Sequence, residues 1–127
     1  MHGGTFVTVI NCMDGRTQIA VNEYLRDKYN VDFVDTITEP GPNGILAENN
    51  DQQAIDSIKK RIDISVNKHG SKHIAIVGHH DCAGNPVDEK TQKEHIISAV
   101  KTVESWDYDC EVVGLWVDDN WKVNLVE

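Results

Sequence analysis

The sequence predicts an α/β fold: a single domain over residues 1–127, with a central, mostly parallel sheet of four strands, an antiparallel edge strand, and helices on both faces. Two observations predict this fold. Short runs of β-branched and apolar residues alternate along the chain with longer segments whose apolar residues recur every three or four positions. The chain has 127 residues, of which 39% are hydrophobic, as expected for one domain with one core.

The first part of the chain reads as strand, helix, strand. Residues 5–10 (TFVTVI) and 31–37 (VDFVDTI) are typical of strands in a buried sheet. Between them, Thr17 can cap a helix that extends to about residue 27. Its apolar face is predicted to contain Ile19, Ala20, Tyr24 and Leu25. Residues 39–44 (EPGPNG) are expected to form a loop, because two prolines and two glycines disfavour regular structure.

The second part continues the alternation. A helix is predicted from about residue 51 to Gly70, followed by a strand at 73–78 (HIAIVG), the most apolar of all. Residues 91–105 show helical spacing, and 111–117 (EVVGLWV) form a fourth strand. After a turn at 118–120, apolar Trp121, Val123 and Leu125 alternate strictly with polar residues. This alternation predicts a half-exposed strand at a sheet edge, antiparallel to its neighbour.

The charge of the chain excludes several classes of partner. Twelve Lys and Arg against 21 Asp and Glu give a formal net charge of −9, which repels nucleic acid and anionic lipid. No apolar run approaches the roughly 20 residues of a membrane helix, and the N-terminus lacks the features of a secretory signal. We therefore expect a cytoplasmic protein with no nucleic-acid or membrane partner. In a reducing compartment the three cysteines are ligands, nucleophiles or core residues, and Cys110 is predicted to be core.

The chemically reactive residues follow the first and third predicted strands, as CMDGR at 12–16 and HHDC at 79–82. Ligands of such sheets bind at the carboxyl ends of the strands, in the crevice where successive crossovers leave in opposite directions. Two thiolates and one imidazole suit zinc and leave a fourth position for water or a carboxylate. Since His79 and His80 are adjacent, both cannot point into one crevice. The sequence therefore predicts a zinc site built from Cys12, Cys82 and one of these histidines.

These two segments resemble the signatures of the β-class carbonic anhydrases, Cys-x-Asp-x-Arg after strand one and His-x-x-Cys after strand three. The matching positions are Cys12, Asp14, Arg16, His79 and Cys82. The order of strands and helices agrees from residue 5 to about residue 126. The resemblance implies a zinc lyase (carbonate dehydratase) that hydrates carbon dioxide reversibly, acts as a homodimer or a multiple of dimers, and uses His79 as the third ligand.

Two further sets of residues are candidates for a role in catalysis or in substrate binding. A bidentate pair with Arg16 would hold Asp14 back from the zinc as a hydrogen-bond acceptor, although the two could also form a plain ion pair in a turn. Gly41, Asn43 and Gly44 could bind substrate or simply turn the chain. We thus predict Asp14 and Arg16 to be catalytic and the three loop residues to be substrate-binding.

Three functions fit these residues. The leading hypothesis is a zinc hydratase, because zinc lowers the pKa of bound water to about 7 and the resulting hydroxide attacks carbon dioxide, carbonyl sulfide or carbon disulfide. The second is a zinc-binding protein without hydratase activity, with a binding or structural role. The third uses Cys12 as a nucleophile, with Arg16 binding an oxyanion as in phosphatases, but this loop is short for wrapping a phosphate. Apolar residues on the last strand and three tryptophans also predict a homodimer or larger assembly.

Overall fold

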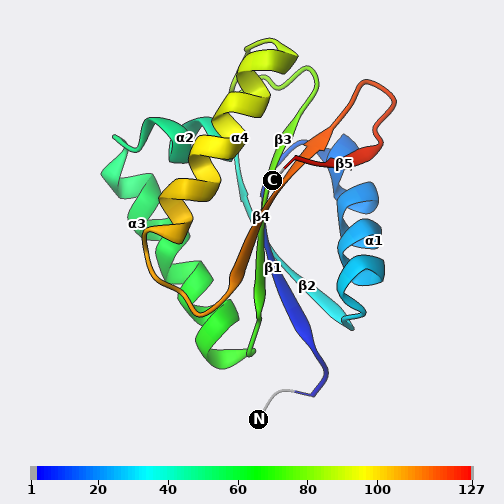
Figure 1. Ribbon diagram of the computed structural model, residues 1–127, viewed down its shortest axis with the longest axis vertical. Coiled ribbons are helices and arrows are strands. Elements are labelled where there is room, and N and C mark those ends of the chain that lie inside the picture. The colour runs from blue at the N-terminus through cyan, green and yellow to red at the C-terminus, as the bar shows by residue number, and fades with distance from the viewer. Residues whose placement is uncertain (1–2, 127) are drawn as a thin grey trace.

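The computed structural model describes residues 3–126, which form a five-stranded sheet between layers of helices (Figure 1). The order of the strands across the sheet is β2-β1-β3-β4-β5; the first four are parallel, and β5 is antiparallel to β4. Their bounds are β1 Phe6–Cys12, β2 Phe33–Glu39, β3 His73–His79, β4 Glu111–Val117 and β5 Val123–Leu125. This arrangement confirms the predicted fold class, including the antiparallel edge strand.

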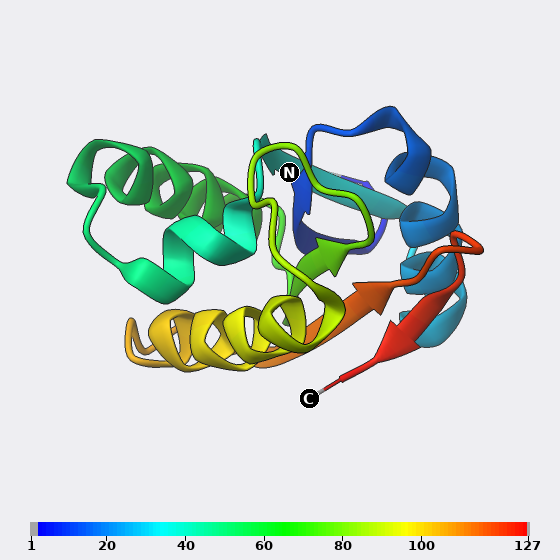
Figure 2. The ribbon, with the colours of Figure 1, turned by 90° about the horizontal axis from the view of Figure 1, so that it is seen from above.

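The helices divide between the two faces of the sheet. One face is covered by α1 (Gln18–Tyr29), and the other by α2 (Pro42–Glu48), α3 (Gln52–Asp63) and α4 (Glu89–Glu104), as Figure 2 shows from above. A 3₁₀ turn, η1 (Gly15–Thr17), precedes α1, and a π-helical turn, η2 (Ile64–Lys68), extends α3. Within residues 3–126, no helix combines the length and the apolar character that crossing a membrane requires.

The two central strands are buried on both faces, which explains their nearly continuous apolar sequences. Val7 and Val9 of β1 pack with α1, whereas Ile10 points to the opposite face. In β3, Ile74 and Ile76 lie on that second face, toward α3 and α4. Because β1 and β3 are neighbours and parallel, their carboxyl ends come together at the upper edge of the sheet in Figure 1.

One predicted loop is wrong: residues 39–44 contain a helix start. The strand β2 extends to Glu39, and α2 begins at Pro42. Proline suits the first turn of a helix because its missing N–H has no helical partner there. Gly41 has φ 59° and ψ 55°, the left-handed conformation that glycine adopts readily and that turns the chain into the helix.

Two predictions about single residues, in α1 and at Cys110, can be compared with the structure. Ile19 is 73% exposed, so its assignment to the apolar face of α1 is wrong. Leu25 is buried as predicted, together with Val21. Those two residues are four positions apart and therefore lie on one side of the helix. Cys110 packs against the core on the α3 and α4 face, as predicted, and its thiol donates to the carbonyl of Ser71.

Candidate metal centre at the carboxyl edge of the sheet

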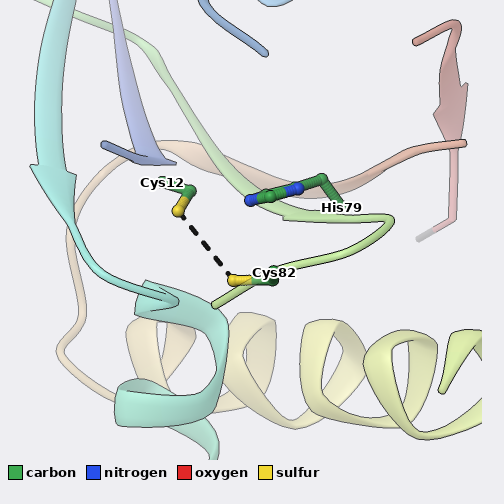
Figure 3. Close-up of side chains that lie close together, drawn as sticks. All are labelled: Cys12, His79 and Cys82. Carbon is green, nitrogen blue, oxygen red and sulfur yellow. Dashed lines mark hydrogen bonds between the residues drawn. The ribbon is translucent and has the colours of Figure 1, made fainter. Parts of the chain in front are cut away.

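Three side chains that could bind a metal converge where β1 and β3 end. Cys12 is the last residue of β1, His79 is the last of β3, and Cys82 follows in the loop toward α4. Figure 3 shows the two thiols facing one another with the His79 ring beside them; the sulfur atoms are 3.9 Å apart. The three ligand atoms all lie within 4.8 Å of one another, and all three residues are buried. The predicted set of Cys12, His79 and Cys82 is thus assembled in space.

A hydrogen bond to the backbone of the next residue orients the imidazole of His79. Its Nδ1 lies 2.7 Å from the carbonyl oxygen of His80, which only accepts, so Nδ1 carries the proton. The other nitrogen, Nε2, is buried and has no hydrogen-bond partner among the described residues. In a metal-binding histidine, one ring nitrogen binds the metal, and the other usually donates a hydrogen bond to a group such as a carbonyl. The ring of His79 has this arrangement. The side chain of His80, by contrast, is exposed.

The titration of the two thiols is asymmetric. The hydrogen bond from Cys82 lowers the pKa of the Cys12 thiol; burial opposes this, while His79 and the backbone N–H of Gly41 lower the pKa further. The same contact with Cys12 raises the pKa of Cys82. Burial, the largest single effect, lowers the pKa of His79, but the Cys12 sulfur, the carbonyl of His80 and the charge of Asp14 together outweigh it and raise this pKa. The cluster therefore carries negative charge on Cys12 and has protons that a cation would displace.

A carboxylate lies next to this cluster but is bound by a guanidinium. Oδ2 of Asp14 is 4.0 Å from Nε2 of His79. Both oxygens of Asp14 accept hydrogen bonds from Arg16: Nε donates at 3.1 and 3.2 Å, and a terminal nitrogen donates at 2.7 Å. These hydrogen bonds lower the pKa of Asp14 to about 2. Asp14 is therefore an ionised acceptor at the rim of the centre, and Arg16 donates hydrogen bonds to both of its oxygens.

The loop after β2 supports the segment that carries Cys82. A Cβ atom added to Gly41 would lie 2.7 Å from Cβ of Asn85, and one added to Gly44 would lie 2.8 Å from its amide carbon. Asn43 is buried and donates to Oε1 of Gln92 at 2.8 Å. The three residues predicted to bind substrate thus pack against the loop after β3 and helix α4. Substrate contact by these residues stays a prediction.

The space beside the cluster is a small, mainly apolar cavity of about 220 Å³. It is lined by Cys12, Met13, Asp14, Pro40, Ala83 and Gly84. Gly84 closes one wall tightly, because a Cβ atom there would lie 2.5 Å from the carbonyl carbon of Pro40.

Several residues near the candidate metal centre were not predicted from the sequence to belong to the site. Gln92 is 1% exposed, and its Nε2 donates to the carbonyl of Asn85 at 2.8 Å, which fixes the loop beyond Cys82. The sequence does indicate that Gln92 is buried, because it lies one helical turn before Ile96, on the apolar face of α4. Asp81 and Trp121 both contact Arg16, and no local pattern indicates either contact.

Comparisons with known proteins agree with the geometry. Two solved structures share the fold over 95% of this chain and 81% of theirs: a carbonic anhydrase from Streptococcus mutans, at TM-score 0.67 and 16% identity, and one from Glaciozyma antarctica, at 0.61 and 13%. No curated protein sequence matches the chain. Residues 2–127 match the sequence model of the family described as "Putative carbonic anhydrase". The chain therefore belongs to the carbonic anhydrase family, as the β-class signatures that begin at Cys12 and His79 predict.

Proposed function

We propose that this protein is a zinc-dependent carbonate dehydratase in which Cys12, His79 and Cys82 hold the metal. The observation that carries the proposal is the convergence of two thiols and an unpartnered imidazole nitrogen within 4.8 Å. A tetrahedral ion with Zn–S bonds of about 2.3 Å separates its two sulfur ligands by roughly 3.8 Å. The sulfur atoms of Cys12 and Cys82, 3.9 Å apart, are therefore suitably spaced for zinc.

Three protein ligands leave a fourth position, and this feature distinguishes catalytic zinc sites from closed structural ones. A bound zinc ion would provide a nucleophile at neutral pH by lowering the pKa of a coordinated water to about 7. Asp14 is ionised at that pH, since its pKa is about 2, and so it accepts a hydrogen bond without giving up a proton. Arg16 keeps both Asp14 oxygens engaged, and this leaves the fourth position open.

The cavity matches a small, linear, uncharged electrophile such as carbon dioxide, carbonyl sulfide or carbon disulfide. Its lining by Met13, Pro40, Ala83 and Gly84 presents mainly apolar surface beside Cys12. We include Gly41, Asn43 and Gly44 in the substrate site because they shape the segments that bear Pro40 and Gly84. The proposal also places the protein in the cytoplasm as a homodimer or larger homo-oligomer; Leu125, 54% exposed on the edge strand, is available for such contact.

Hydration of carbon dioxide by the zinc-loaded protein tests this proposal. Stopped-flow detection of proton release should show a rate that depends on protein concentration and disappears after zinc is removed by a chelator. Cys82→Ser should abolish the rate and weaken zinc binding, whereas His80→Ala, a matched change at the neighbouring exposed imidazole, should retain both. Full zinc occupancy without hydration would contradict the hydratase proposal and favour a zinc-binding protein with a structural or binding role.

A further inference from the structure

Trp121 has an unusual backbone conformation next to the candidate centre. Its φ of 59° places a bulky side chain in the left-handed region, where steric repulsion between Cβ and the backbone is costly. Four other non-glycine residues within the described residues share a positive φ. Asn30 and Asn49 end α1 and α2, and Asp107 follows α4, where left-handed residues are ordinary. Asp81 lies in a turn, where aspartate tolerates this conformation. Trp121 ends the three-residue hairpin loop between Asp118 and Lys122, a position where the left-handed conformation is usual but a bulky residue is not.

The turn between β4 and β5 is built to hold Trp121 in this conformation. The backbone N–H of Trp121 donates to the carbonyl of Asp118 at 2.9 Å. The Asp118 carboxylate accepts from the backbone N–H groups of Asn120 and Lys122, on either side of Trp121, and from the amide of Asn124. One aspartate thus ties down the backbone before and after the strained residue, so the surrounding hydrogen bonds offset the strain.

Asp81 and Trp121 both contact the guanidinium of Arg16. The indole of Trp121 lies over Arg16, with the guanidinium carbon 4.4 Å from the ring centroid. From the loop after β3, the carbonyl oxygen of Asp81 accepts from Arg16 at 3.1 Å, and its carboxylate lies 3.3 Å from the other terminal nitrogen. Two loops that are distant in sequence therefore converge on the arginine that binds Asp14.

We propose that Trp121 is a positioning residue that restrains Arg16, and through Arg16 holds the Asp14 carboxylate off the metal. The inference rests on the proposed function in assigning the centre a metal with an open fourth position. Arg16 is 46% exposed at its side chain, and exposed ion pairs alone restrain long side chains weakly. A flat aromatic face adds stacking and a cation–π attraction, which favour one orientation of a planar guanidinium.

The short distance between Asp14 and His79 explains why the Asp14 carboxylate needs this restraint. Oδ2 of Asp14 is already 4.0 Å from Nε2 of His79, so a small rotation of the carboxylate would bring it to the position of a fourth ligand. With the indole removed, Arg16 gains freedom to turn toward solvent, and the Asp14 carboxylate is released to move toward the metal position.

The test uses Trp121→Gly, because glycine adopts the left-handed conformation without strain and should preserve the turn. Trp121→Phe retains an aromatic face and serves as the conservative variant. The matched control is Trp106→Leu, which removes an indole whose centroid is 5.1 Å from the ammonium of Lys59, after α4. In the metal-free proteins, the NMR signal of the Arg16 Nε–H should be displaced by the indole ring current. We expect this displacement in the wild type and in Trp106→Leu, a reduced one in Trp121→Phe, and none in Trp121→Gly.

The visible spectrum of the proteins loaded with Co²⁺ reports whether a carboxylate reaches the metal. Trp121→Gly should change this spectrum at neutral pH, and adding Asp14→Asn in the same chain should restore it. With zinc, hydration by Trp121→Gly should fall about fivefold, the scale of a partly exposed cation–π contact, at full metal occupancy. An unchanged Arg16 signal in Trp121→Gly, or a spectral change that persists with Asp14→Asn, would overturn the inference. A wild type that binds metal without hydrating carbon dioxide would refute the proposed function alone, since the NMR and cobalt measurements require no turnover.

Discussion

Replacing Arg16 by alanine should suppress hydration while leaving zinc in place. In the wild type, Arg16 donates to both oxygens of Asp14, and its backbone N–H donates to Oδ1 at 2.9 Å. The substitution removes the side-chain bonds and keeps the backbone bond. Asp14 then has a free oxygen 4.0 Å from Nε2 of His79, close enough to move onto the metal. The three predicted zinc ligands are untouched, so metal binding should survive.

The pKa of Asp14 gives the size of the effect. Lowering this pKa from 3.8 to about 2 corresponds to about 2.4 kcal/mol in favour of the ionised carboxylate, and the Arg16 side chain is the largest cause. Arg16 is 46% exposed, so solvent screening reduces the contribution to about 1 kcal/mol. Losing it shifts the balance between a free and a metal-bound carboxylate by about fivefold or more. We expect hydration to fall by at least this factor.

The assay compares the wild type, Arg16→Ala, and the double variant Asp14→Ala with Arg16→Ala, at neutral and alkaline pH. Stopped-flow rates and zinc content are measured on the same samples. The double variant should regain part of the rate, because the blocking carboxylate is gone together with its restraint. Wild-type rates in Arg16→Ala at neutral pH would refute this reasoning and leave the pair as a surface turn. Loss of zinc from Arg16→Ala would assign the arginine a structural role instead.

Three further outcomes are expected. His79→Ala should bind zinc at least tenfold more weakly by competition with a chromogenic chelator, whereas His80→Ala should bind like the wild type; equal losses would contradict the assignment of His79. Gly84→Ala should destabilise the fold by about 1–3 kcal/mol in urea unfolding, because its Cβ would lie 2.5 Å from the Pro40 carbonyl carbon, whereas Gly15→Ala, with no neighbour within 4 Å, should not. Because the folded pKa of Asp14 is lowered to about 2, its contribution to stability is complete above pH 3.8 and is lost as the pH falls through 2. Asp14→Asn should therefore show a smaller loss of stability than the wild type between pH 5 and pH 2.5, and an identical loss would argue against the ion pair.

The sheet could be predicted because its strands are encoded locally. β-branched, apolar runs mark all four parallel strands, and right-handed crossovers then restrict their order. The start of α2 could not be read in the same way, since the Pro and Gly residues of 39–44 suit a loop or a helix start equally. Their conformation depends on packing: Gly41 and Gly44 lie against Asn85, a contact between distant segments.

The convergence of the candidate metal ligands could be predicted for a related reason. Cys12 and His79 end two neighbouring parallel strands, so the sheet itself brings them to one edge. The surroundings of these ligands depend instead on loop conformations that composition does not determine. Trp121 lies over Arg16 from the turn between β4 and β5, where its own backbone is left-handed. Gln92 supports the Cys82 loop through a hydrogen bond to Asn85, which requires that loop to fold onto α4.

X-ray absorption by zinc in the loaded protein tests the central claim most directly, because it counts the ligands by element. The predicted shell contains two sulfur atoms at about 2.3 Å and two nitrogen or oxygen atoms at about 2.0–2.1 Å. Cys12→Ser and Cys82→Ser should each remove one sulfur from any zinc that remains bound, whereas Cys110→Ser should leave the shell unchanged. A wild-type zinc shell without sulfur would contradict a zinc centre built from Cys12, His79 and Cys82. A shell that keeps both sulfur atoms in Cys12→Ser and in Cys82→Ser would contradict it too.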